Sequence, residues 1–184
     1  MAALRRRWAA ELVHYWFNVL DAADWFGGGP AVDAALRARF ARDLDMMAQA
    51  RAASFLEGPE EALAAVLLFD QVPRNLFRDS PRAFLYDPLA RTIVHAALHR
   101  GWDRSLSPRQ RQFLYMPLMH SEDIADQQLS LALFRTLPRG YGWAFARAHY
   151  RMIARFGRFP HRNAVLGRKS TAAEKRAVAA GFSW

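Results

Sequence analysis

The stretch from Pro59 to about Phe69 constrains the fold more than any other, because it is almost entirely apolar after its first turn. Gly58-Pro59-Glu60-Glu61 predicts a helix start, since proline suits the first helical position and early glutamates suit the positive end of the helix dipole. A helix that is apolar on every side has to be covered by its neighbours. We therefore expect this helix to be the central and most buried element.

Amphipathic helices are predicted for the rest of the chain, because apolar residues recur at three- and four-residue spacing and no segment alternates like a strand. The expected helices cover residues 4–20, 33–55, 59–69, 81–99, 108–116, 120–137, 141–156 and 171–180. Ser107–Gln110 and Thr171–Glu174 are capping-box signatures, and Pro117 is expected to end the helix before it. The predicted fold class is all-α: a single domain over residues 1–184 with about eight antiparallel helices.

The composition excludes several classes of site and of protein. The chain has no cysteine, which rules out disulfides, thiolate metal sites and cysteine nucleophiles. No apolar run approaches the roughly 20 residues that span a bilayer. The apolar run after Arg5-Arg6-Arg7 is broken by Glu11 and His14, unlike that of a signal peptide. Metal-binding and phosphate-loop motifs do not occur. We expect a cytoplasmic protein with no membrane span, no metal and no cofactor.

The formal net charge of +9 belongs to one segment of the chain. No acidic residue lies between Asp126 and Glu174, and that interval holds nine cationic residues, whereas the other 17 cations equal the 17 acids. Clustered positive charge is compatible with nucleic-acid binding. Because the chain has no helix-turn-helix, zinc-finger or RNA-recognition signature, nucleic acid is disfavoured as a partner. Arginines mixed with aromatic residues suit carboxylate or phosphate pairing as well.

Residues 155–163 are the densest mixture of cationic, aromatic, glycine and proline residues in the sequence. Gly157 and Pro160 both interrupt regular structure, so neither a simple helix nor a strand fits this stretch. Asp70 is expected at the negative C-terminal end of the central helix, where a carboxylate needs a cationic partner. Arg74 is the local candidate for that partner, and the arginines of residues 155–163 are the distant candidates.

Three segments together resemble a known bacterial family. They are Leu67-Leu68-Phe69-Asp70-Gln71-Val72-Pro73-Arg74-Asn75-Leu76-Phe77-Arg78, Phe113-Leu114-Tyr115-Met116-Pro117-Leu118-Met119-His120-Ser121-Glu122 and Arg155-Phe156-Gly157-Arg158-Phe159-Pro160-His161-Arg162-Asn163. The family is the one called domain of unknown function 924, and the resemblance extends from Trp16 to Phe182. It implies an all-helical fold similar to tetratricopeptide-repeat superhelices, with no established activity. Asp87-Pro88 departs from the family pattern and implies a kink or a restart in the fourth helix.

These segments contain more polar residues than a helical scaffold needs for folding, which marks them as candidates for one ligand-binding site. The predicted site residues are Asp70, Gln71, Arg74, Asn75, Arg78, His120, Ser121, Glu122, Gln127, Arg158, His161, Arg162 and Asn163. Gln127 is included because a glutamine among core-facing positions has to be hydrogen-bonded.

Three functions are compatible with this set. The first is a binding module in which Arg74, Arg78, Arg158 and Arg162, offset by Asp70 and Glu122, meet His120 and His161 around an anionic small molecule or an acidic peptide. The second is an enzyme in which His120 or His161 is the general acid or base and Glu122 orients it. The third is a structural or protein-interaction scaffold in which the polar residues form an internal ion-pair network. The sequence does not decide whether the protein is an enzyme, and it leaves the oligomeric state open.

Overall fold

A computed structural model describes residues 2–182, and no strand occurs in that part of the chain. The ends of the predicted domain, Met1 and Ser183-Trp184, lie outside the described residues. The α-helices are α1 (Ala2–His14), α2 (Ala22–Phe26), α3 (Pro30–Met47), α4 (Pro59–Val66), α5 (Val72–Leu76), α6 (Asp87–His99), α7 (Pro108–Met119), α8 (Ile124–Phe134), α9 (Trp143–Phe156) and α10 (Ala172–Ala179). Short 3₁₀ turns at Ala52–Phe55, Pro81–Phe84, Trp102–Ser105 and Pro160–Arg162 connect some of them.

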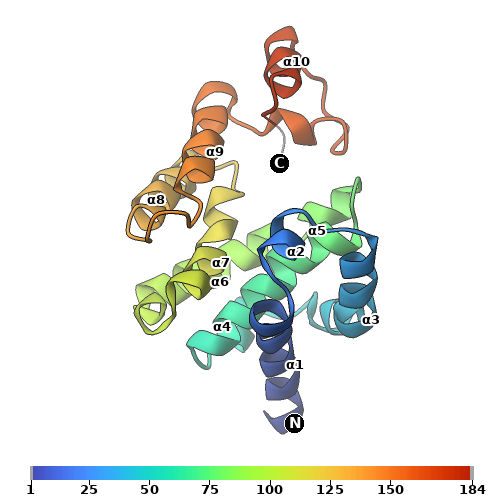
Figure 1. Ribbon diagram of the computed structural model, residues 1–184, viewed down its shortest axis with the longest axis vertical. Helices are drawn as coiled ribbons and strands as arrows, with labels where there is room; N and C mark the ends of the chain where they lie inside the picture. The colour runs from blue at the N-terminus through green and yellow to red at the C-terminus, as the bar shows by residue number, and fades with distance from the viewer. Residues whose placement is uncertain (1, 183–184) are drawn as a thin grey trace.

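The central helix is confirmed as the most buried element. Every residue from Ala62 to Asp70 is 0% exposed, and α4 packs against α1, α6 and α7. The helix does not end at Phe69, however. A π-helical turn, Leu67–Gln71, joins α4 directly to α5, so that residues 59–76 form one continuous helical segment (Figure 1). Pro73 has no backbone N–H that could donate to a carbonyl one turn earlier. The π-helical turn, which is wider than an α-helical turn, lies just before this proline.

Nine helical segments, rather than about eight, form the described part of the chain when residues 59–76 are taken as one. The additional segment is α2, which lies between two predicted helices and was not itself predicted. It begins because Asp21 and Asp24 form a reciprocal capping box: the Asp21 carboxylate accepts from the backbone N–H of Asp24, 3.1 Å away, and Asp24 accepts from that of Asp21. The capping boxes predicted at Ser107–Gln110 and Thr171–Glu174 are both confirmed.

Several predicted helix boundaries are wrong, and tertiary packing explains them. The helix expected over residues 33–55 ends at Met47, and Pro117 lies inside α7 instead of ending it. Both flanking turns of Pro117 are buried, so burial holds the helix together through the proline. The fourth helix restarts at Asp87, which is its first residue and not its cap. Asp123 caps α8 by accepting from Ala125 N at 2.8 Å.

The helices form one large core and one small core. The large core extends from α1 to α9, and α6, α7, α8 and α9 pack against one another in sequence order. The small core is built from Met152, Ile153, Phe159 and Ala177, and it joins the end of α9 to α10. Figure 1 shows α10 at the opposite end of the molecule from α1. Across residues 2–182, none of the helices combines the length and apolar character that crossing a membrane requires.

Candidate functional site

The predicted site residues converge only in part, on a pocket of about 1080 Å³ that we call the polar pocket. Its lining comes from α2, α5, α7, α8, α9 and the segments between these helices and before α10. The predicted residues that line it are Gln71, Arg74, Asn75, Arg78, His120, His161 and Arg162. Asp70 is fully buried behind this wall and contacts two of its members, His120 and Arg74.

Five ionisable groups form a chain along the wall of the polar pocket. His120 Nδ1 lies 2.8 Å from Asp70 Oδ1, and Arg74 Nη1 lies 3.1 Å from the same oxygen. Arg74 also donates to both oxygens of Asp87, at 2.9 and 3.0 Å. The far end of the chain is Arg162, whose Nη1 lies 3.7 Å from Asp87 Oδ2. Arg74 is therefore the partner of Asp70, as the local candidate predicted, and the link to residues 155–163 runs through Asp87.

The π-helical turn positions the buried end of this chain. Asp70 and Gln71 are the last two residues of the turn Leu67–Gln71, inside a helical segment that is otherwise apolar. The Gln71 amide donates to Asp70 Oδ2, and the Asn75 amide donates to Gln71 O at 3.0 Å. Such turns shift the following side chains around the helix axis and occur frequently at functional sites. The turn thus brings a carboxylate and an amide to the pocket from the most buried helix.

Asp70 and His120 have defined protonation states at neutral pH. Burial raises the pKa of Asp70, but Arg74 and His120 more than offset it and hold that pKa well below its usual range. Burial lowers the pKa of His120 below 6.5, and Arg74 adds to this although Asp70 opposes it. A neutral histidine beside an ionised carboxylate carries its proton on Nδ1 and donates it to Asp70. Nε2 is then the unprotonated ring nitrogen of a side chain that lines the pocket.

Arg162 is the least neutralised charge of the site. It is 7% exposed, and its guanidinium lies between the rings of Phe84 and Phe159, at 4.6 and 4.5 Å from their centroids. Its Nε is buried and has no hydrogen-bond partner among residues 2–182. Burial lowers its pKa from 12.5 to about 10, and repulsion from Arg74 adds to that effect. The pocket wall therefore carries a buried cation with one unused hydrogen-bond donor, Nε.

His149 and His161 complete the polar wall. Burial is the main cause that lowers the pKa of His149 to about 3 and that of His161 to about 4, and Arg162 contributes to both. His149 was not among the predicted site residues; its Nδ1 lies 2.8 Å from Phe145 O, in hydrogen-bond contact. At neutral pH the histidines are uncharged while Arg74 and Arg162 are charged. The field on the wall near Arg162 consequently favours an anion.

The remaining predicted site residues do not line the polar pocket, which corrects the expected convergence. Arg158 donates to Glu174 at 2.7 and 3.1 Å, and through this pair it anchors the start of α10. Glu122 accepts from Arg168 at 2.7 and 2.9 Å and from Phe159 N at 2.8 Å, so it orients no histidine. The carboxylate that holds His120 is Asp70. The segment 157–171 folds back on itself, and this path decides which arginine meets which acid.

Three other predicted residues have structural contacts. The Ser121 hydroxyl accepts from Asp123 N at 3.1 Å, and the buried Gln127 amide donates to Met119 O and Ser121 O, both at 2.7 Å. The expectation that Gln127 is hydrogen-bonded is confirmed. Asn163 is fully buried and donates to Ser170 Oγ at 3.0 Å. These contacts fix the link between α7 and α8 and the loop before α10.

Arg78 lies on the pocket wall but is already paired. Its guanidinium donates to both oxygens of Asp33, at 2.6 and 2.8 Å, and to Asn75 Oδ1 at 3.0 Å. Gly28 is required beside it, because a Cβ there would lie 2.6 Å from Arg78 Nη2 and the backbone has φ +59°. Asp87, Arg168 and Glu174 were not predicted as site or partner residues, and the only signal was the unusual Asp87-Pro88 pair.

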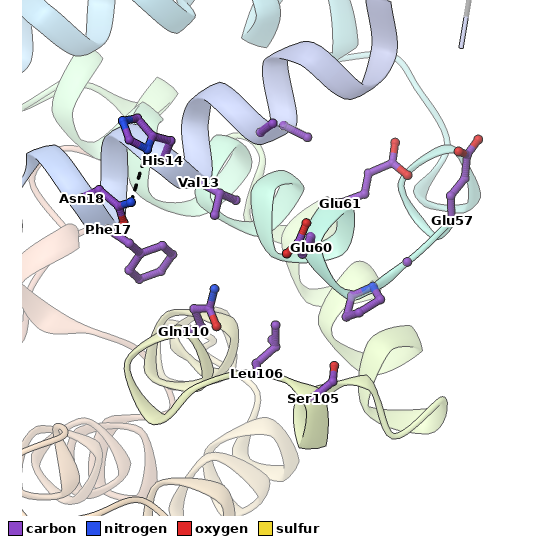
Figure 2. A pocket seen from close by; sticks show the side chains of 14 residues that line it. Val13, His14, Phe17, Asn18, Glu57, Glu60, Glu61, Ser105, Leu106 and Gln110 are labelled. Atoms are coloured by element: carbon purple, nitrogen blue, oxygen red, sulfur yellow. Dashed lines mark hydrogen bonds between the residues drawn. The ribbon is translucent and has the colours of Figure 1, made fainter. Parts of the chain in front are cut away.

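A second pocket, of about 1050 Å³, lies between α1, α4 and the loop before α7 (Figure 2). Glu57, Glu60 and Glu61 stand on one side of it and His14 and Asn18 on another, with 3.3 Å between His14 Nδ1 and Asn18 Nδ2 (Figure 2). It is lined by none of the predicted site residues and by no arginine or lysine. The glutamates belong to the predicted start of the central helix, so we assign the candidate site to the polar pocket.

Comparison with known proteins identifies the family but not the reaction. The family profile described as a bacterial protein of unknown function, DUF924, matches residues 12–181. A solved structure from Agrobacterium tumefaciens, the protein of unknown function ATU0120, is similar with a TM-score of 0.89 and 38% sequence identity. The similarity covers 98% of this chain and 99% of that one. No curated protein matches the chain. The motifs of residues 67–78, 113–122 and 155–163 lie inside the matched range, and the chain belongs to the DUF924 family.

Proposed function

We propose that the polar pocket binds a small anionic molecule, a carboxylate or a phosphate, through Arg162 with Arg74 beside it. The observation that carries this proposal is Arg162 itself. It is a buried cation on the pocket wall whose nearest acidic oxygen is 3.7 Å away, and its Nε has no partner among the described residues. A guanidinium suits the two oxygens of such a group, and charge-assisted bonds of this kind are the strong ones.

The alternative, a purely internal ion-pair network, explains most of the polar residues but not Arg162. Arg74, Arg78, Arg158 and Arg168 each donate to a carboxylate at 3.1 Å or less. A network built only for structure would satisfy its most buried arginine as well, because an under-paired buried charge is costly. The proposal thus separates one ligand-binding arginine from four structural ones.

A small molecule fits the polar pocket better than an acidic peptide does. The volume of about 1080 Å³ is close to the upper end of typical small-molecule sites. The cationic groups form one short wall rather than an extended stripe. We also propose that α6 to α9 form the antiparallel, tetratricopeptide-like stack that the family resemblance implies, which their packing in sequence order supports.

Titration with inorganic sulfate tests the proposal, since sulfate stays fully ionised across the useful pH range. We expect saturable binding measured by calorimetry, with affinity that increases as the pH is lowered from 7.5 to 5. The sign follows from linkage: an anion beside His120, whose free pKa lies below 6.5, raises that pKa, so a proton is taken up on binding. A titration with no saturable heat at either pH would contradict the proposal.

A second candidate function, proton transfer to and from a bound molecule, is supported by the Asp70–His120 pair. Asp70 holds His120 at 2.8 Å in the tautomer that leaves Nε2 as the base. Mono-4-nitrophenyl succinate is a suitable probe, because it carries a carboxylate for Arg162 and an ester. His120 would take a proton from water as the water oxygen adds to the ester carbonyl and 4-nitrophenolate leaves.

His120→Gln is the variant that tests this candidate, since glutamine can still donate to Asp70. We expect it to slow release of 4-nitrophenolate by about 100-fold, the lower range for removing a general base. Circular dichroism would show that the variant is folded. Equal rates for the variant and the original protein would exclude His120 as the base.

A further inference from the structure

The lining of the polar pocket combines polar and apolar side chains, both among its buried residues and among its exposed ones. Arg162 and Gln71 are buried on the polar side. Met116, Met119 and Phe134 are also buried, and they form an apolar wall beside that polar side. The exposed lining at the mouth includes two aromatic residues, Phe26 at 61% and Phe145 at 57%, besides the charged Arg78 and Asp79.

The aromatic side chains at the mouth come from two separate elements that the fold fixes in place. Phe26, in α2, stacks on Phe113 of α7 with 6.3 Å between centroids and 10° between planes. Phe145 lies in the first turn of α9, and this helix begins directly after Gly142. A Cβ on Gly142 would lie 3.1 Å from the ring of Phe134, and its φ of +89° favours glycine, so α9 starts as close to the pocket wall as it can.

Single exposed apolar residues are normal on a protein surface, but two aromatic rings on one pocket mouth are not explained by chance exposure. They continue an apolar wall that begins inside the pocket, and they contribute nothing to the neutralisation of Arg162. An inorganic anion bound at Arg162 would contact only the polar side of the pocket and would leave most of the 1080 Å³ to water.

We infer that the ligand is an amphipathic acid, whose anionic head binds at Arg162 and whose apolar body lies along Met116, Met119 and Phe134 towards Phe26 and Phe145. This inference rests on the proposed function. The ligand is a free small molecule rather than a lipid in a bilayer, because the apolar wall lies inside the pocket, where only a body that enters with the head can reach it.

A series of alkyl sulfonates tests the inference, since the head group and its charge stay constant while the chain lengthens. From methanesulfonate to hexanesulfonate we expect affinity to increase roughly fourfold per buried methylene group, and by at least about 50-fold over the series. Phe145→Ser should weaken hexanesulfonate binding by roughly fivefold to tenfold and leave methanesulfonate binding unchanged. Phe26→Ser should do the same, and it provides a second variant in case one fails to fold.

Met46→Ser is the matched control, because Met46 is 60% exposed but does not line the pocket. It should leave the whole series unchanged. If methanesulfonate and hexanesulfonate bind equally, or if the control weakens hexanesulfonate as much as Phe145→Ser does, this inference is overturned while anion binding stands. If neither sulfonate binds, the proposed function fails, and this inference fails with it.

Discussion

Replacing Asp70 with asparagine should lower the free energy of unfolding by about 3 kcal/mol, the lower end of the range for breaking a buried ion pair. Asp70 is fully buried, and its carboxylate holds Arg74 and His120. Asparagine has nearly the same shape, so the loss would come from the charge and not from a cavity. Because Arg74 keeps its second partner, Asp87, we do not expect a stability loss at the upper end of that range. Equilibrium unfolding in urea gives this quantity directly.

Asp33→Asn is the matched control for Asp70→Asn. It removes a carboxylate from Arg78, whose side chain is 49% exposed, and exposed pairs of this kind contribute about 1 kcal/mol or less. If the two variants lose the same stability, the burial of the Asp70 carboxylate has no special role. Equal m-values would show that the change lies in the folded state.

The pH dependence of the Asp70→Asn effect has a definite sign. The folded pKa of Asp70 is lowered from its ordinary value of 3.8, so its stabilisation is fully present above that value. The stabilisation is lost only as the pH falls towards the folded pKa. Because Asp70 also acts on the pKa of His120, the effect is measured in the His120→Gln background. There the effect of Asp70→Asn should stay constant from pH 7 to about pH 5 and shrink only below about pH 4.

Local signals in the sequence were sufficient for most of the fold. The apolar helix after Gly58-Pro59 and the capping boxes of α7 and α10 depend on residues within a few positions of each other, so the sequence displays them directly. Gly157, whose φ is +68°, ends α9 as expected. Errors arose where packing overrides local preference: Pro117 stays inside a buried helix, and the helix predicted from residue 120 begins only at Ile124.

The candidate site was predictable as a set of segments but not as a set of pairs. Seven of the predicted residues do meet in one pocket: Gln71, Arg74, Asn75, Arg78, His120, His161 and Arg162. Which acid meets which arginine depends on the path of residues 157–171, which no short-range pattern specifies. Glu122 thus pairs with Arg168, and Arg158 pairs with Glu174, which was outside the predicted set. The π-helical turn that turns Asp70 towards His120 has no sequence signal beyond Pro73.

Replacing Arg162 with glutamine should lower the affinity for sulfate by about 100-fold, because the variant loses the charge of a guanidinium that lines the pocket. The same change should leave the stability nearly unchanged or increase it. A pKa lowered from 12.5 to about 10 means that the fold disfavours the charged guanidinium by about 3 kcal/mol. The lost contacts with the rings of Phe84 and Phe159, worth about 1–2 kcal/mol, offset part of that gain.

Stability and affinity that move independently would distinguish a binding residue from a structural one. A structural arginine stabilises the fold through its partner, so its removal lowers stability, whereas Arg162 has only a distant partner, Asp87 at 3.7 Å. Arg158→Gln is the control: it removes an arginine of the same loop that lines no part of the pocket and that pairs with Glu174. It should keep the original affinity for sulfate. An Arg162→Gln variant that unfolds would instead assign Arg162 to the internal network. A buried charge that is retained to bind a ligand lowers the stability of the ligand-free protein, whereas one that is retained for the fold does not.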